Sequence, residues 1–136
     1  MKYAILDTNV VVSAMLSHLD HGYPAEVLRR VTERKIVPIY STALMEEYEE
    51  VLRRKKFNFD EHDIIMVLSK LRYFGIREER LPGLTFTPTC SDIDDQAFYD
   101  LLLSTDAILI TGNTKHFPLD SKRIFTPSEF CQSFHF

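Results

Sequence analysis

The sequence predicts an α/β fold built around a mainly parallel sheet. Two short runs, residues 3–6 and 107–110, are continuously apolar, as strands are when helices cover both faces of a parallel sheet. Between them lie segments with apolar residues at helical spacing, and an alternation of strands and helices is typical of this class. A chain of 136 residues is expected to form one domain, over residues 1–136.

The predicted strands are short apolar runs that end at polar or turn residues. They cover residues 3–6, 36–40, 107–110 and 123–125, with a further short strand near 84–86. Asp7 follows the first run directly, and a turn from Thr111 to Asn113 follows the run at 107–110. Pro38 has no N–H group to give to a sheet ladder, so it favours an edge position for its strand.

The predicted helices carry apolar residues at intervals of three and four. They cover residues 10–16, 24–35, 41–52, 60–73 and 92–103, and a last helix begins at 126–129. Pro24 suits the first turn of its helix, and Ser41 or Thr42 can cap the third. Thr126 and Glu129 form a capping-box pattern, which predicts the C-terminal helix.

Composition narrows the classes of protein that need to be considered. Hydrophobic residues make up 45 % of the chain, enough for a core, and the net charge of −4 disfavours a passive nucleic-acid coat. Two cysteines, Cys90 and Cys131, show no metal-binding spacing and suit a reduced, intracellular protein. Asp7 comes too early for a signal peptide, and no apolar run approaches the roughly 20 residues that span a bilayer. We therefore expect a cytoplasmic protein with no membrane association.

Asp7 and Glu47 are the first two candidate site residues. Asp7 ends a predicted parallel strand, where α/β folds place their sites, although helix capping explains an aspartate there equally well. Glu47 lies three residues after Leu44 and four before Val51, on the margin of the apolar stripe, while its neighbouring glutamates point away. A carboxylate in that place needs a cation or hydrogen-bond donors. The plain alternatives are an ion pair with an arginine such as Arg53, or a side chain that reaches out to solvent.

Two further candidates come late in the chain. Asp92, Asp94 and Asp95 open a predicted helix, which its dipole partly explains, and spacing does not choose between Asp94 and Asp95. Asn113 belongs to a Gly-Asn pair that is common in turns, and it could instead orient a water molecule or a phosphate at a metal.

Carboxylates that converge from separate elements repel one another, and a hard cation would stabilise them at neutral pH. Oxygen ligands suit Mg²⁺ or Mn²⁺, which activate water and neutralise charge on a phosphodiester. Hydrolysis of a phosphodiester bond is the chemistry that this set of residues predicts.

The order and spacing of these segments resemble the PIN-domain family. Residues 5–10 resemble the opening strand with its first catalytic aspartate, and residues 41–52, reading STALMEEYEEVL, resemble the segment with the conserved glutamate, here Glu47. Residues 91–102 resemble the helix with the third acid, and the family spacing selects Asp95 followed by Phe98. Residues 109–113 resemble the late strand and its turn.

The resemblance implies a three-layer α/β/α sandwich and an Mg²⁺- or Mn²⁺-dependent endoribonuclease, similar to the toxins of toxin–antitoxin pairs. It implies Asp7, Glu47 and Asp95 as metal ligands, a small antitoxin protein as partner, and frequent homodimers. Many members have an aspartate where this chain has Asn113, so the choice between one metal ion and two stays open, as does a share for Asp92 or Asp94.

RNA contacts are expected near the same turn. Lys115 and His116 follow it directly, and with Asn9 and Thr111 they are the predicted substrate-binding residues. The basic run at 53–56 is better explained as a solvated helix end.

Three other functions stay open from the sequence. A catalytically weak PIN-like module that binds RNA or protein would explain Asn113 and the acidic net charge. A phosphatase of the haloacid dehalogenase type also opens with an aspartate after its first strand, but it wants a second one where Asn9 stands. A receiver domain gathers acids at strand ends too, but no phosphoacceptor can be assigned.

Overall fold

The computed structural model describes residues 1–79, 101–102, 105–116 and 122–134. Within them the chain forms a five-stranded sheet in the order β3-β2-β1-β4-β5, and every strand pair is parallel. The strands are β1 (Lys2–Leu6), β2 (Ile36–Tyr40), β3 (Ile76–Arg77), β4 (Ile108–Ile110) and β5 (Ile124–Phe125). The predicted α/β class with a parallel sheet is confirmed.

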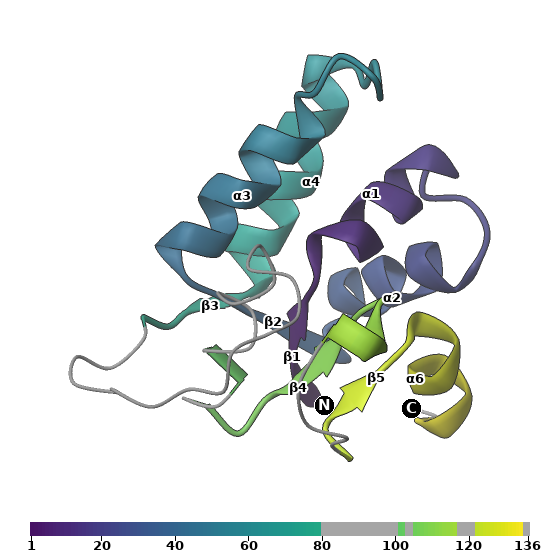
Figure 1. Cartoon of the computed structure of the whole chain (residues 1–136), viewed down its shortest axis with the longest axis vertical. Helices are drawn as coiled ribbons and strands as arrows, with labels where there is room; N and C mark the ends of the chain where they lie inside the picture. Colours follow the sequence, from purple (N-terminus) through teal and green to yellow (C-terminus); the bar gives the residue numbers. More distant parts are fainter. Residues whose placement is uncertain (80–100, 103–104, 117–121, 135–136) are drawn as a thin grey trace.

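The helices are α1 (Thr8–Leu16), α2 (Tyr23–Thr32), α3 (Thr42–Leu52), α4 (Glu61–Phe74) and α6 (Pro127–Ser133), with a short 3-10 turn, η2 (Thr114–His116). Together with the sheet they form the expected three-layer α/β/α arrangement (Figure 1). α2 packs against α6, and α3 pairs with α4 in a hairpin that projects beyond the sheet. No helix in the described ranges is long and apolar enough to cross a bilayer.

The helix ends that the sequence predicted are largely as expected. The Ser41 side chain accepts a hydrogen bond from the Leu44 N–H at 3.1 Å, and α3 therefore begins at Thr42. Thr126 and Glu129 form the complete capping box at the start of α6. The strand predicted near 84–86 and most of the helix predicted at 92–103 lie outside the described residues.

The prediction of an edge position for β2 was wrong. β2 lies between β1 and β3, and its partner β3 is a strand of two residues that the sequence did not indicate. The β3 ladder begins at Ile39, one residue after Pro38, so the proline stands before that pairing rather than within it. The chain reaches β3 through Gly75, whose backbone passes close to the Pro38 carbonyl.

The sheet is buried on both faces, as the continuous apolar runs predicted. Ala4, Ile5 and Leu6 are all fully buried, and so are Leu109 and Ile110 in the neighbouring strand. Because the strands are parallel, β1 and β4 end at the same edge of the sheet. The polar residues that follow them are therefore brought together there.

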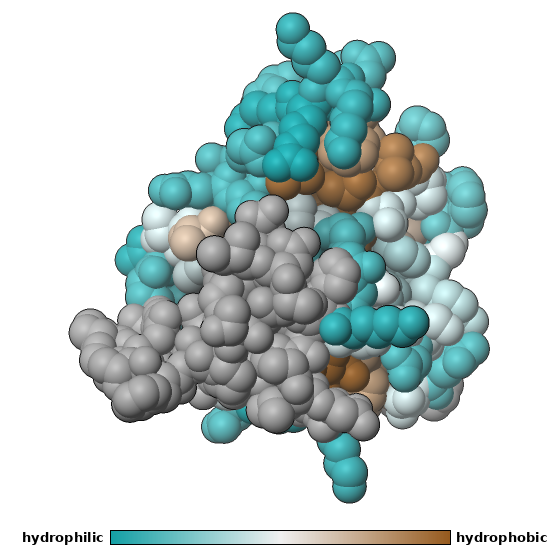
Figure 2. Space-filling model, in the orientation of Figure 1, coloured by the Kyte–Doolittle hydropathy of each residue, from teal (hydrophilic) through white to brown (hydrophobic). Residues whose placement is uncertain are grey.

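One side of α4 remains apolar at the surface. Its inward residues Ile64 and Val67 are buried, but Ile65 and Met66 are about half exposed. Figure 2 shows hydrophobic surface gathered beneath the hydrophilic tip of the α3–α4 hairpin. A hollow of about 620 Å³ lies there, between the end of α1 and the start of α4. Packing against the core explains why the buried apolar residues of α4 recur at helical spacing, but it does not explain the exposed Ile65 and Met66.

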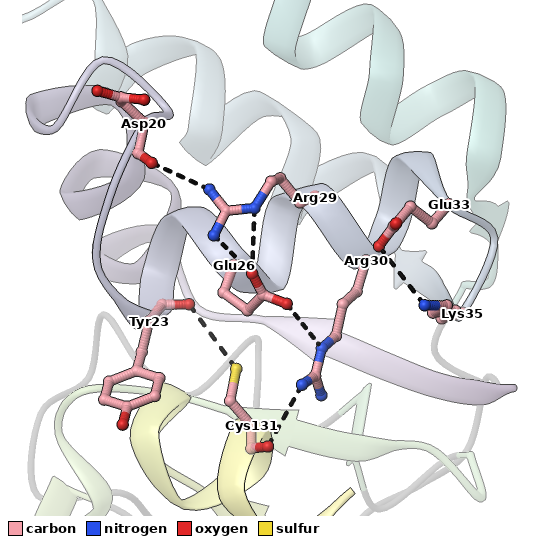
Figure 3. Close-up of polar contacts among 8 residues, drawn as sticks. All are labelled: Asp20, Tyr23, Glu26, Arg29, Arg30, Glu33, Lys35 and Cys131. Carbon is pink, nitrogen blue, oxygen red and sulfur yellow. Dashed lines mark hydrogen bonds and ion pairs between the residues drawn. The ribbon is translucent and has the colours of Figure 1, made fainter. Parts of the chain in front are cut away.

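Arg30 fastens α6 to α2. Its guanidinium donates to the carbonyls of Phe134 at 2.9 Å and Cys131 at 3.3 Å, and it also binds Glu26 (Figure 3). The Arg30 side chain is only 12 % exposed, whereas that of Arg29, which binds the same glutamate, is 47 % exposed. Arg30 thus satisfies carbonyl groups at the end of α6 that the helix itself leaves without donors.

We expect Arg30→Met to lower the free energy of unfolding by about 2 kcal/mol, because charged hydrogen bonds in a shielded place are lost. Urea denaturation measures this change. Arg29→Met is the matched control and should cost less than about 1 kcal/mol, as exposed ion pairs do. Equal losses in the two variants would contradict the fastening role of Arg30.

Candidate active site

Asp7 occupies the N-cap position of α1 without acting as a cap. Its backbone is extended there, but its side chain makes no capping hydrogen bond. Its N–H donates to the Ile110 carbonyl at 2.9 Å, which continues the β1–β4 pairing by one residue. The residue is 3 % exposed. A buried aspartate whose carboxylate is not used for capping indicates a role other than starting the helix.

The Asp7 carboxylate is held by one residue from the first turn of α1 and one from the loop after β4. Thr111 Oγ1 donates to its Oδ2 at 2.5 Å, and Asn9 Nδ2 donates to the same oxygen at 3.2 Å. Asn9 Oδ1 in turn accepts the Gly112 N–H at 3.1 Å, and Thr111 Oγ1 accepts the Asn113 N–H at 3.0 Å. The first turn of α1 and the loop after β4 are thereby joined, and the carboxylate keeps one orientation.

Glu47 lies beside the same strand end. Its half-buried side chain accepts a hydrogen bond at 2.5 Å from the Oγ1 of Thr8, the residue that directly follows Asp7 in the chain. The arginine that offered the plain alternative is engaged elsewhere, because Arg53 binds Glu61 at 2.8 Å. α3 therefore directs Glu47 toward the Asp7 region, as its position on the helix predicted.

The other glutamates of α3 serve the surface. Glu49 pairs with Arg72 of α4, and Glu50 pairs with Arg54 at 2.9 Å. Glu46 is exposed. The contrast with Glu47 confirms the geometry expected from the helical spacing.

Tyr48 and Thr8 are site residues that sequence reasoning missed. Tyr48 is 2 % exposed, and its hydroxyl donates to the carbonyl oxygen of Leu6, the residue before Asp7. Burial raises the pKa of Tyr48 well above its ordinary value, and the charges of Asp7 and Glu47 raise it further. The sequence placed Tyr48 in the apolar stripe of its helix. The available signal was its hydroxyl, which needs a partner when buried.

The remaining predicted residues differ in where the structure places them and in whether it describes them. Asn113 and Lys115 are exposed, in the loop after β4 and in η2, and the backbone of His116 lies in η2. Asp95, like Asp92 and Asp94, lies outside the described residues. Asn9 and Thr111, predicted to bind substrate, hold Asp7 through hydrogen bonds.

The side chains at this edge of the sheet that could bind a metal ion offer carboxylate, hydroxyl or amide oxygen atoms. Residues 1–79 together with the later described segments hold no cluster of three metal-binding side chains, and Asp7 and Glu47 are the carboxylates they bring to this site. Two carboxylates in a largely buried place fit a hard divalent cation, because each would otherwise raise the cost of keeping the other charged. The described set therefore fits Mg²⁺ or Mn²⁺ as a partial ligand shell.

Comparison with known proteins agrees with the fold. A family model described as a PIN domain matches residues 3–115, which include Asp7, Glu47 and the residues that hydrogen-bond to them. The chain is also similar to an uncharacterized protein of Methanocaldococcus jannaschii, MJ1680, with 26 % identity over 144 residues that cover 96 % of this chain and 90 % of the relative. The family match leaves the phosphatase and receiver-domain interpretations without support. Because that family model covers most of the chain, the chain belongs to the PIN-domain family.

Proposed function

We propose that the protein is a metal-dependent endoribonuclease whose active site contains Asp7, Glu47, Asp95 and Asn113. PIN domains are in general nucleases that use divalent metal ions, and the chain belongs to that family. The observation that carries the proposal is the state of Asp7. It is a buried aspartate at an N-cap position that makes no capping bond and is instead oriented by Thr111 and Asn9.

Asp7, Glu47 and Asp95 would hold Mg²⁺ or Mn²⁺, and the bound ion would activate water and offset charge on the phosphodiester. The protein groups contribute by positioning. Thr111 and Asn9 fix the Asp7 carboxylate, and Thr8 fixes Glu47. Such preorganised groups need not rearrange when the reaction proceeds, which is where much of an enzyme's rate enhancement arises.

RNA would approach over the loop after β4. Lys115 is exposed on η2, directly beyond the residues that hold Asp7, and it can offer a charge to a phosphate. We assign His116 to the same contact on its sequence position. With a net charge of −4 the molecule as a whole repels a polyanion, so binding would depend on local cations and on the metal.

The deciding experiment measures cleavage of a labelled single-stranded RNA by the wild-type chain in Mn²⁺, in Mg²⁺ and with a chelator. We expect cleavage within the RNA that requires either ion. Asp95→Asn should lower the cleavage rate by about a hundredfold or more, because a ligand charge is lost. Asp106→Asn is the matched control, since it makes the same chemical change at an exposed aspartate eleven residues further along the chain. Equal rates in wild type and Asp95→Asn would contradict the assigned role of Asp95.

We further propose that the protein acts in the cytoplasm as the toxin of a toxin–antitoxin pair, blocked by a small antitoxin protein, and that it forms homodimers. The support is the similarity of its motifs to those toxins. Expression of the wild-type chain should arrest growth, and co-expression of a short adjacent reading frame should restore it. Light scattering of the purified chain tests the dimer.

The second candidate is a PIN-like module that binds RNA or protein with little or no cleavage. Asn113 favours it, because asparagine brings no charge where many members have an aspartate. RNA binding without metal-dependent cleavage, in a protein that is folded and stable, would identify this case.

A further inference from the structure

The Tyr48 hydroxyl ties α3 to the strand that delivers Asp7. We propose that Tyr48 is a positioning residue, whose hydrogen bond to the Leu6 carbonyl sets the separation of the Asp7 and Glu47 carboxylates for metal binding. The proposal rests on the metal-dependent function proposed above. It adds a residue that neither strand position nor the helix pattern indicated.

The contacts flank Asp7 on both sides. Tyr48 donates to Leu6, one residue before Asp7, and Thr8, one residue after it, donates to Glu47 at 2.5 Å. Two adjacent residues of α3 thus bond to the two neighbours of Asp7 in the chain. The acid lies between two points of attachment, and neither helix nor strand can slide past the other without breaking one.

Burial gives the Tyr48 bond its importance. Tyr48 is 2 % exposed and Leu6 is fully buried, so water cannot replace the hydroxyl as a donor to the Leu6 carbonyl. Apolar packing around the ring holds α3 near the sheet, but the hydrophobic effect is non-directional. The hydrogen bond is directional, and it supplies the register that packing alone does not fix.

The register matters because two carboxylates in one site repel each other. Without the hydrogen bond from Tyr48 to the Leu6 carbonyl, that repulsion favours a wider separation of β1 and α3. A metal site tolerates displacements of its ligands of only about half an ångström. Phenylalanine at position 48 would fill the same space and leave this repulsion without its opposing bond.

The test compares Tyr48→Phe with Tyr23→Phe in the full chain. Tyr23 is the control, because its hydroxyl also takes part in a hydrogen bond between two elements, accepting from Gln132 Nε2 at 3.1 Å between α2 and α6. Mn²⁺ binding is measured without RNA by electron paramagnetic resonance, and the free energy of unfolding is measured without metal. We expect about tenfold weaker Mn²⁺ binding in Tyr48→Phe, the lower end of what groups behind metal ligands contribute, and unchanged binding in Tyr23→Phe.

Cleavage gives a second readout. Tyr48→Phe should need about tenfold more Mn²⁺ for half-maximal cleavage, and its rate at saturating Mn²⁺ should approach that of wild type. Thr8→Val removes the second attachment and should weaken Mn²⁺ binding in the same direction, which keeps the proposal testable if Tyr48→Phe folds poorly. The two substitutions should be non-additive, because both act on one separation.

The outcomes separate the two proposals. If wild type binds Mn²⁺ and cleaves RNA while Tyr48→Phe binds Mn²⁺ equally well, the positioning role is overturned and the function stands. A loss of stability in Tyr48→Phe with unchanged Mn²⁺ affinity has the same meaning, because it assigns the hydroxyl to the fold alone. A wild-type chain that binds no Mn²⁺ overturns both.

Discussion

Replacing Asp7 with asparagine is expected to abolish RNA cleavage while leaving the fold intact. The substitution keeps the shape of the side chain, and an amide oxygen can still accept from Thr111 and Asn9. The charge that would hold the metal is lost. We expect the cleavage rate at fixed Mn²⁺ to fall on the order of a hundred- to a thousandfold, the range seen when one preorganised electrostatic group is removed.

Stability should respond in the opposite sense. Asp7 is a buried anion near a second one, Glu47, so its removal relieves repulsion, and the melting temperature of Asp7→Asn should equal or exceed that of wild type. Asp20→Asn, at an exposed position between α1 and α2, should change neither quantity. A strongly destabilised Asp7→Asn with its residual activity proportional to the folded fraction would instead assign Asp7 a structural role.

Gly75→Ala is expected to cause a large loss of stability. A Cβ atom on Gly75 would lie 2.4 Å from the Leu71 carbonyl oxygen and 2.5 Å from the Pro38 carbonyl oxygen. Both obstacles are backbone atoms, one in α4 and one in β2, so relief requires the end of α4 to change its backbone and to move away from β2. The cost should be about 3 kcal/mol or more in the free energy of unfolding, at the upper end for overpacking, measured by urea denaturation.

The backbone angles of Gly75, φ −96° and ψ 178°, are open to any residue, so the predicted loss is steric. Gly112→Ala is the control, because its Cβ would meet the nearest atom, Asn9 Oδ1, at an ordinary 3.5 Å. We expect a change within about 1 kcal/mol there. Equal stability of the two variants would show that α4 and β2 can separate freely at this point.

Much of the fold could be predicted because its signals are local. The runs at residues 3–6 and 107–110 are continuously apolar, since helices cover both faces of the sheet, and the capping box of Thr126 and Glu129 depends on residues three apart. The errors came from non-local facts. Pro38 suggested that β2 lies at the edge of the sheet, but β3 pairs with β2 only beyond this proline. The strand β3 itself has two residues, too few to show the alternation of side chains that identifies a strand.

The site divides in the same way. Glu47 could be recognised because a helix fixes the direction of each side chain, and its position relative to Leu44 is a matter of spacing. Recognising Asp7 depended on the expectation that the strands are parallel, because α/β folds place their sites at the carboxyl ends of parallel strands. The partner of Tyr48 could not be predicted, because the Leu6 carbonyl is 42 residues away and no sequence pattern encodes that contact. Asp95 remains a prediction from resemblance.

The bond between Thr111 and Asp7 joins residues 104 positions apart. During synthesis the first strand leaves the ribosome long before the turn that orients its aspartate, because domains are made from the amino terminus. Contacts of such large separation form late, after the chain has closed a long loop. The residues that complete the site thus come from distant parts of the chain. We expect a chain interrupted before Thr111 to lack activity, so that cleavage begins only after the turn that follows β4 has been made.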